Sequence, residues 1–298
     1  MRLRAFLSRV NPVSVYFLSL ILGFSLMSCD VDVITNFDDG DVANTNHSAS
    51  AEFSFRPKVA HQSSLRLDAI SGSVEIVGVS DTDLVNIWGV RRVDSESTED
   101  ATAHLERLSV HVREDSDEIV VETEQPKDAH GRNYIVNYHI YVPHTWRILV
   151  EHVNGKITLS SMDNQVDIKL INGEVSMDSG HAHVDVELVN GSMRLWDISG
   201  NVEGTLVNGN IDSKVSLAAS GTCKLKTVNG KITLSIPQST SAAFSARVTH
   251  GTIVLSDLSL QDQHVSPTTV TGKLGAGDGR IDLEAVNGNI VVDGFPTR

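Results

Sequence analysis

The sequence His181-Ala182-His183 contains the two histidines that are best spaced for metal chemistry. Residues i and i+2 of a strand share one face, so both imidazoles could bind one Zn²⁺ together with one or two further ligands. Asp163 is a candidate third ligand. The repeat described below places these residues in a turn, and we favour exposed turn residues over a metal site.

A column of carboxylates is the second candidate. Five positions before successive repeat corners the residues are Asp167, Asp185, Glu203 and Lys224, followed by Ser245 and Asp282. Stacked carboxylates repel one another or bind a hard cation such as Ca²⁺. Lys169 and Lys226 lie in the adjacent column, close enough to neutralise them. We therefore favour a solvated face of mixed charge over a cation site.

Nucleophilic and phosphate-binding motifs are not supported. Cys223 aligns with Val166, Val184 and Val202, so it points inward and acts as a small apolar residue. The GAGDG segment near Gly275 lacks the lysine and hydroxyl residue of a phosphate loop, and we interpret it as a turn. The sequence predicts a protein that is not an enzyme and has no cofactor.

These residues are positioned by an internal repeat. The eight residues VNGKITLS occur at Val153–Ser160 and again at Val228–Ser235. Asn-Gly pairs recur at intervals of about 20 residues, which is typical of a solenoid whose units stack on one another. The pairs are Asn154-Gly155, Asn172-Gly173, Asn190-Gly191, Asn208-Gly209, Asn229-Gly230 and Asn287-Gly288, with His250-Gly251 as a variant.

Each unit contains two short strands, because apolar residues alternate with polar ones on both sides of Asn-Gly. Val166, Ile168 and Leu170 precede one corner, and Val175 and Met177 follow it. Asn-Gly also joins antiparallel hairpins, but columns in register favour coils stacked about 4.8 Å apart. We predict an all-β solenoid of 18–21-residue coils, with corner Asn side chains hydrogen-bonded along the stack.

The domain organisation follows from these patterns. Residues 149–298 form the VNG-repeat solenoid, interrupted by a Gly-, Ser- and Pro-containing excursion at 256–279. Residues 51–148 form an N-terminal β region of degenerate coils, with one short helix near 99–108 and His152 buried where the full coils begin. An aromatic content of only 5% and 22 glycines agree with a β-rich fold.

The N-terminus resembles a bacterial lipoprotein signal peptide covering residues 1–28. Basic residues precede an apolar run too short to span a bilayer, which ends in Leu26-Met27-Ser28-Cys29. Cys29 is then the lipid attachment site, carrying an acyl chain such as palmitate. The alternative is an ordinary signal peptide with an incidental cysteine. Residues 29–50 are acidic and aperiodic, and we predict a flexible tether.

Charge limits the possible partners. The formal net charge is −14, so the surface repels nucleic acid and anionic lipid headgroups. We therefore expect attachment to the membrane through the lipid alone, and no nucleic-acid partner.

Three segments resemble the DUF4097 family of bacterial β-strand-repeat proteins, whose members are often provisionally labelled adhesins. They are YHIYVPHTWRILVEHVNGKITL, the tandem VNG units, and GKLGAGDGRIDLEAVNGNIVV at the end. The resemblance covers roughly residues 60–298 and departs mainly at His250. It implies a β-helical solenoid and an adhesin-like function.

We therefore expect a lipid-anchored envelope protein that presents repeat faces to an unidentified protein or an envelope glycan. Trp88, Trp146 and Trp196 are candidate anchors, and Trp196 is the preferred one, although a partly covered tryptophan near a turn is the simpler interpretation. The alternative is a periplasmic component of envelope stress or assembly. Asp30 favours retention inside the envelope and the family label favours display, so the leaflet stays open.

Overall fold

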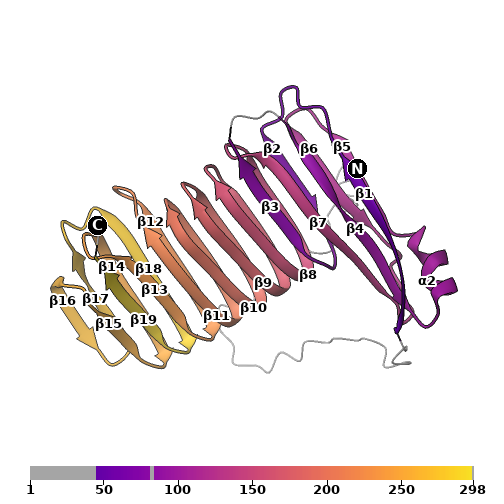
Figure 1. Cartoon of the computed structure of the whole chain (residues 1–298). Coiled ribbons are helices and arrows are strands. Elements are labelled where there is room, and N and C mark those ends of the chain that lie inside the picture. The colour runs from indigo at the N-terminus through magenta and orange to yellow at the C-terminus, as the bar shows by residue number, and fades with distance from the viewer. Residues whose placement is uncertain (1–44, 81–83, 297–298) are drawn as a thin grey trace, which may run out of the picture.

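The protein is an elongated stack of β-coils whose strands run across the long axis (Figure 1). The computed structural model describes residues 45–80 and 84–296, which form nineteen strands and one helix. The predicted all-β fold is confirmed, as is a short helix, α2 (Thr98–Leu105). The strands are β1 (His47–Phe55), β2 (Ser64–Asp68), β3 (Val74–Val79), β4 (Asn86–Ser95), β5 (Ser109–Glu114), β6 (Glu118–Glu124), β7 (Asn133–Pro143), β8 (Arg147–Met162), β9 (Val166–Gly180), β10 (His183–Ser199), β11 (Asn201–Ser216), β12 (Thr222–Asn229), β13 (Ile232–Pro237), β14 (Ala242–His250), β15 (Ile253–Ser256), β16 (Leu260–Ser266), β17 (Thr269–Leu274), β18 (Gly279–Asn287) and β19 (Ile290–Phe295).

Each central coil, from β8 to β11, is one long strand that bends at its Asn-Gly pair. The residues before the bend belong to a first sheet and those after it to a second sheet. Neighbouring coils are parallel, with Ile148 paired to Val166 before the bend and Ile157 paired to Val175 after it. In the flanking coils the bend divides the strand in two, as between β12 and β13.

The two sheets share the central coils and differ at their ends. The first sheet has the order β5-β6-β2-β8-β9-β10-β11-β12-β18-β14-β17-β16. The second has the order β1-β4-β7-β3-β8-β9-β10-β11-β13-β19-β15. Antiparallel pairs occur at the ends of the sheets, where hairpins replace coils.

The order of coils in the stack departs from their order in the chain. The last coil, β18–β19, lies between β12–β13 and β14–β15 (Figure 1). The carboxylate column expected from the sequence order is therefore wrong at this end, because Asp282 pairs with Lys224 and Ser245 lies beyond it. The excursion before the last coil is also structured, since β16 and β17 continue the first sheet past β14.

Glycine makes the bend at each corner. Gly191 has φ +141°, whereas its neighbour Asn190 has no positive φ, so the corner is a bend inside a strand and not a two-residue hairpin turn. A Cβ added to Gly191 would lie 1.6 Å from the carbonyl oxygen of Gly173 in the adjacent coil. Close stacking and backbone conformation therefore both require glycine here.

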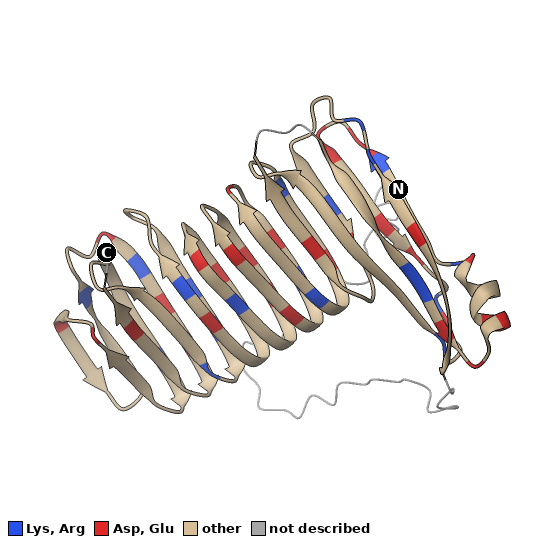
Figure 2. Cartoon of the chain, in the orientation of Figure 1, with Lys and Arg blue, Asp and Glu red and all other residues tan. Residues whose placement is uncertain are grey.

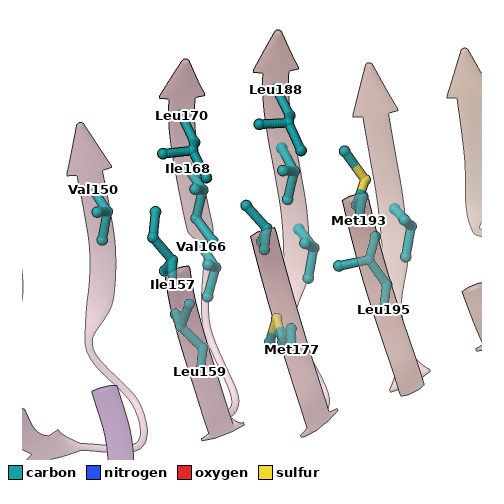
Figure 3. Close-up of a cluster of buried hydrophobic side chains, with 14 of the residues drawn as sticks. Val150, Ile157, Leu159, Val166, Ile168, Leu170, Met177, Leu188, Met193 and Leu195 are labelled. Carbon is teal, nitrogen blue, oxygen red and sulfur yellow. The ribbon is translucent and has the colours of Figure 1, made fainter. Parts of the chain in front are cut away.

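The core lies between the two sheets and consists of the inward half of each alternating pattern (Figure 3). Val166, Ile168 and Leu170 of the first sheet face Ile157 and Met177 of the second, and all are almost fully buried. Burying each such side chain contributes about 1.5–3 kcal/mol. Stacking thus gives every interior coil the same apolar contacts on both sides.

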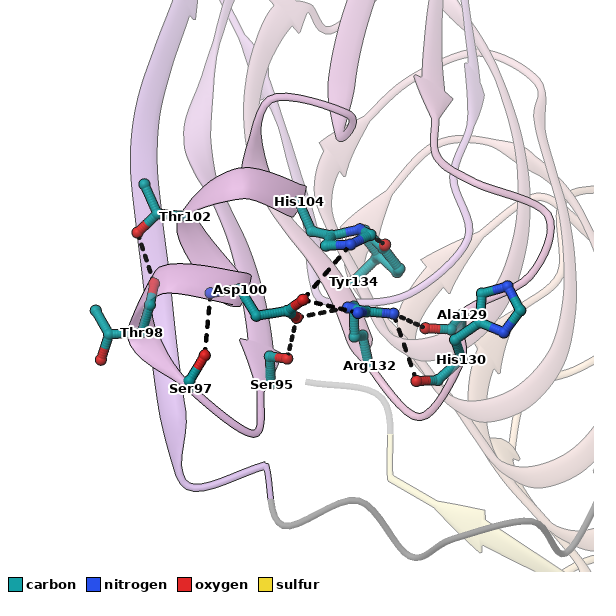
Figure 4. Close-up of polar contacts among 10 residues, drawn as sticks. All are labelled: Ser95, Ser97, Thr98, Asp100, Thr102, His104, Ala129, His130, Arg132 and Tyr134. Atoms are coloured by element: carbon teal, nitrogen blue, oxygen red, sulfur yellow. Dashed lines mark hydrogen bonds and ion pairs between the residues drawn. The ribbon is translucent and has the colours of Figure 1, made fainter.

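A helix and an ion pair close the N-terminal end of the stack. Helix α2 packs against β1 and β4, and the Ser97 side chain caps it by accepting from the Asp100 amide at 3.1 Å. Arg132 donates to both carboxylate oxygens of Asp100, with Nε–Oδ2 2.6 Å and Nη2–Oδ1 2.8 Å (Figure 4). Ser95 donates to the same carboxylate.

Two predictions made for the N-terminal residues have different outcomes. The predicted tether, residues 29–50, extends too far, because β1 begins at His47 and pairs with β4. The signal peptide and Cys29 lie outside the described residues. Within 45–80 and 84–296, no helix has the length and apolar character to cross a membrane.

Candidate functional site

The corner asparagines form a hydrogen-bonded ladder along the stack, as predicted. In each bond, the side-chain amide Nδ2 of one asparagine donates to the side-chain oxygen Oδ1 of the asparagine in the preceding coil of the stack. The five distances are 2.9 Å for Asn172 to Asn154, 2.9 Å for Asn190 to Asn172, 2.8 Å for Asn208 to Asn190, 2.8 Å for Asn229 to Asn208, and 2.9 Å for Asn287 to Asn229. The corner asparagines supply one another's hydrogen-bond partners, so we interpret the corner as a structural element.

The outer face of the first sheet carries charges of both signs (Figure 2). Arg147 Nη2 lies 2.7 Å from Asp167, and Lys224 pairs with Glu203. In the next column, Lys226 lies 2.9 Å from Glu284. The mixed-charge face that we favoured is present, and its ion pairs join neighbouring coils.

A shallow pocket of about 290 Å³ lies on this face, and Asp185 is part of its lining. Burial, together with the neighbouring carboxylates of Glu203 and Asp167, raises the pKa of Asp185. Burial also raises the pKa of Glu187, while Lys169 opposes that shift. The described residues contain no group of three or more His, Cys, Asp or Glu side chains arranged for a metal ion.

Asp163 contacts histidines of two neighbouring turns. His144 Nδ1 lies 2.7 Å from Asp163 Oδ2, and His181 Nδ1 lies 3.6 Å from Oδ1. The pKa of Asp163 is lowered: burial acts to raise it, but the hydrogen bonds from His144 and from the His181 amide outweigh burial. His183 begins β10 and is exposed. His144 was missed from sequence, although it lies nearly one coil before Asp163.

Two residues that align with core positions are buried there. His152 pairs with Leu170 and is 0% exposed, and its Nε2 donates to the Gly72 carbonyl at 3.0 Å. Burial lowers the pKa of His152. Cys223 occupies the Val202 column, and burial raises the pKa of its thiol to about 12. A thiol with this pKa is not a nucleophile at neutral pH.

The three tryptophans have different environments. Trp146 is only 5% exposed, so its role as an anchor is contradicted. Trp196 is half-buried on the outer face of the second sheet, with the Arg194 guanidinium 4.6 Å and the Lys214 ammonium 5.8 Å from its ring centre. The two cations cover part of the Trp196 ring, which agrees with the simpler interpretation of a partly covered tryptophan near a turn.

Trp88 belongs to an aromatic cluster on the same face of the second sheet. Its ring stacks on His139, with centroids 5.6 Å apart and an interplanar angle of 18°. Tyr141 meets Trp88 at 84°, with centroids 4.7 Å apart, and is 42% exposed. Glu75 fixes the His139 ring through a 2.7 Å contact with Nδ1. Of these four residues, only Trp88 was identified from sequence.

Comparison with known proteins identifies the family. The family model described as Toastrack DUF4097 matches residues 28–293. A comparison with curated proteins found no match. Similar solved structures include a provisionally named cell adhesion protein from Clostridium sporogenes, with 13% identity and a TM-score of 0.37 over 83% of this chain and 100% of that one. Another is a provisionally named adhesin from Bacteroides fragilis, with 12% identity and a TM-score of 0.35 over 82% and 97% of the two chains. The family match spans nearly the whole sequence, and the chain belongs to the Toastrack DUF4097 family.

Proposed function

We propose that this protein is a non-enzymatic, lipid-anchored component of the bacterial cell envelope that binds a protein or a glycan through the outer faces of its solenoid. One observation carries the proposal. Apolar side chains fill the space between the sheets, whereas aromatic and charged side chains stand in fixed rows on the outside.

A solenoid face suits adhesion for a physical reason. Neighbouring coils repeat a contact at a constant spacing of about 4.8 Å, so many modest contacts add up over an extended partner. Ion pairs and the asparagine ladder hold the coils in register and keep these rows straight. The Cys29 lipid would supply membrane attachment, because the acidic surface does not attract anionic headgroups.

Protease shaving of intact cells tests display, with an antibody against the solenoid as the readout. Cleavage of the wild-type protein on whole cells supports an adhesin-like role. Protection until the outer membrane is breached contradicts display and favours a periplasmic scaffold in envelope assembly or stress.

Cys29→Ser tests the anchor separately. We expect this variant to leave the membrane fraction and to lose incorporation of labelled palmitate, while its solenoid stays folded. Unchanged fractionation of Cys29→Ser would contradict the lipid anchor. The two proteins differ only at residue 29, so a difference in fractionation is attributable to that cysteine.

A further inference from the structure

Two rows of side chains cross the outer face of the second sheet along the stack axis. One row contains Trp88, His139, Glu75, Thr158, Ser176 and Arg194. The other contains Asn86, Tyr141, Val77, Ser160, Asp178 and Trp196. Both rows start at the aromatic cluster of β4 and β7 and reach the Arg194–Trp196 pair on β10, with hydroxyl, carboxylate and valine side chains between.

The aromatic cluster is held in place before any ligand arrives. Tyr141 is 42% exposed, and the Trp88 ring meets it nearly at a right angle. His139 stacks on Trp88 and is itself held by Glu75. Rings that are already fixed lose little conformational entropy on binding, so the cluster is a preorganised contact surface.

The side chains between the two aromatic sites are mostly polar. Thr158 and Ser160 on β8 contribute short, partly exposed hydroxyl side chains, whereas Ser176 beside them on β9 is only 9% exposed. Four strand-to-strand steps separate Tyr141 from Trp196, about 19 Å at a spacing of about 4.8 Å. A linear molecule lying along the stack axis would therefore contact the aromatic cluster at one end, the Arg194–Trp196 pair at the other, and the hydroxyl groups of Thr158 and Ser160 between them.

We propose that this strip binds a neutral, linear glycan, with a sugar ring stacked on Tyr141. Sugars whose hydroxyls are all equatorial have flat C–H faces that pack on aromatic rings, and their hydroxyls donate to groups such as Glu75 and Asp178. A net charge of −14 disfavours an anionic polysaccharide. Short hydroxyl side chains give a protein partner few of the large buried anchors that dominate protein interfaces.

The inference rests on the proposed envelope function and names a ligand class for it. The test is affinity electrophoresis of the full mature chain in gels containing a soluble neutral polysaccharide, with laminarin, xyloglucan and hydroxyethyl cellulose as separate probes. We expect at least one to retard the wild-type protein. Tyr141→Ala should weaken that retardation about 10-fold or more, and Tyr141→Phe, which keeps the ring, by less than about 3-fold.

Val254→Ala is the matched control, because Val254 is 47% exposed on the same sheet but lies beyond the strip, on β15. It should bind like the wild type, and circular dichroism should show that every variant is folded. Failure of all three probes to retard the wild type overturns the inference, as does equal retardation of Tyr141→Ala. Neither result depends on Cys29 or on shaving, so the proposed envelope location would survive both.

Discussion

The coils β8–β11 and the N-terminal section β1–β7 belong to the same two sheets but are held together differently. In the central coils each residue pairs with an equivalent residue 18 positions away, as Asn190 does with Asn172. In the N-terminal section, β2 and β3 still pair in parallel with β6 and β7, but β1, β4 and β5 add antiparallel pairs. A helix and individual contacts such as Asp100–Arg132 secure the end. The aromatic cluster that we propose as a contact surface lies where the strict repeat is lost, while the strip that extends from it crosses the central coils.

Replacing a corner glycine should break the central coils most severely. Gly191→Ala places a Cβ 1.6 Å from the Gly173 carbonyl at a φ of +141°. We expect a loss of about 4 kcal/mol or more in the free energy of unfolding, measured by urea denaturation. Gly277→Ala is the control, since its φ is +84° but the nearest atom is 3.5 Å away, and it should cost about 1 kcal/mol. Equal losses would contradict the stacking argument.

Removing the charge of Asp100 should have the largest effect within the N-terminal section. Asp100→Asn weakens two hydrogen bonds from Arg132 and one from Ser95, so we expect a loss of about 2 kcal/mol at pH 7. Glu99→Gln, an exposed acid in the same helical turn, should change stability by less than about 0.5 kcal/mol. An equal cost for the two variants would show that the ion pair does not secure this end.

The Asp100 carboxyl should also make the stability of the protein depend on pH. Hydrogen bonds from Arg132 and Ser95 hold the pKa of Asp100 far below its usual range. The contribution of the Asp100 carboxylate to the free energy of unfolding is therefore complete above the pKa in the unfolded chain, about 3.9. It is lost as the pH falls towards the pKa in the folded protein. Urea denaturation should show a smaller difference between wild type and Asp100→Asn at pH 2.5 than at pH 7.

The inserted last coil shows what the sequence could not specify. Asn-Gly spacing and alternation predicted the coils, the inward Cys223 and the asparagine ladder, because those features depend on local pattern. Each VNG unit offers the same corner and the same apolar columns, so local pattern fits any stacking order. The position of Asp282 beside Lys224 follows only from the tertiary fold.

The candidate binding strip was partly predictable. Alternation along the β7 segment places Tyr141 outward, yet its contact with Trp88 requires the antiparallel register of β4 and β7. Neither strand carries a turn signal that fixes that register. Trp146 was misassigned for a related reason, since an aromatic residue near a turn packs inward or outward depending on neighbours that the sequence does not identify.

His152 lies at the boundary between the two regions, and its replacement should have an intermediate effect. His152→Leu matches Leu170 of the next coil but leaves the Gly72 carbonyl without its donor, so we expect a loss of about 1–2 kcal/mol at pH 7.5. Burial lowers the pKa of His152, so the unfolded chain binds a proton first as the pH falls below about 6.5. Wild-type stability therefore decreases there.

Urea denaturation at pH 7.5 and 5.0 checks this expectation. The stability difference between wild type and His152→Leu should shrink at the lower pH, because the variant lacks the titrating group. His264→Leu, at an exposed position of β16, controls for the loss of one histidine. A difference that grows at pH 5.0 would mean that the folded state stabilises the imidazolium, against the burial argument.

Substitutions in the asparagine ladder should have the smallest effect on stability, and they compare an interior position of the ladder with its end. Asn190 donates to Asn172 and accepts from Asn208, whereas Asn154 at the first coil accepts from Asn172. Asn190→Ala should cost about 1 kcal/mol and Asn154→Ala about half of that, because these exposed amides exchange their bonds with water on unfolding. Chemical denaturation of both variants measures the ratio. Equal costs would mean that the ladder bonds do not act independently, and that each substitution instead disturbs the bend at its own corner.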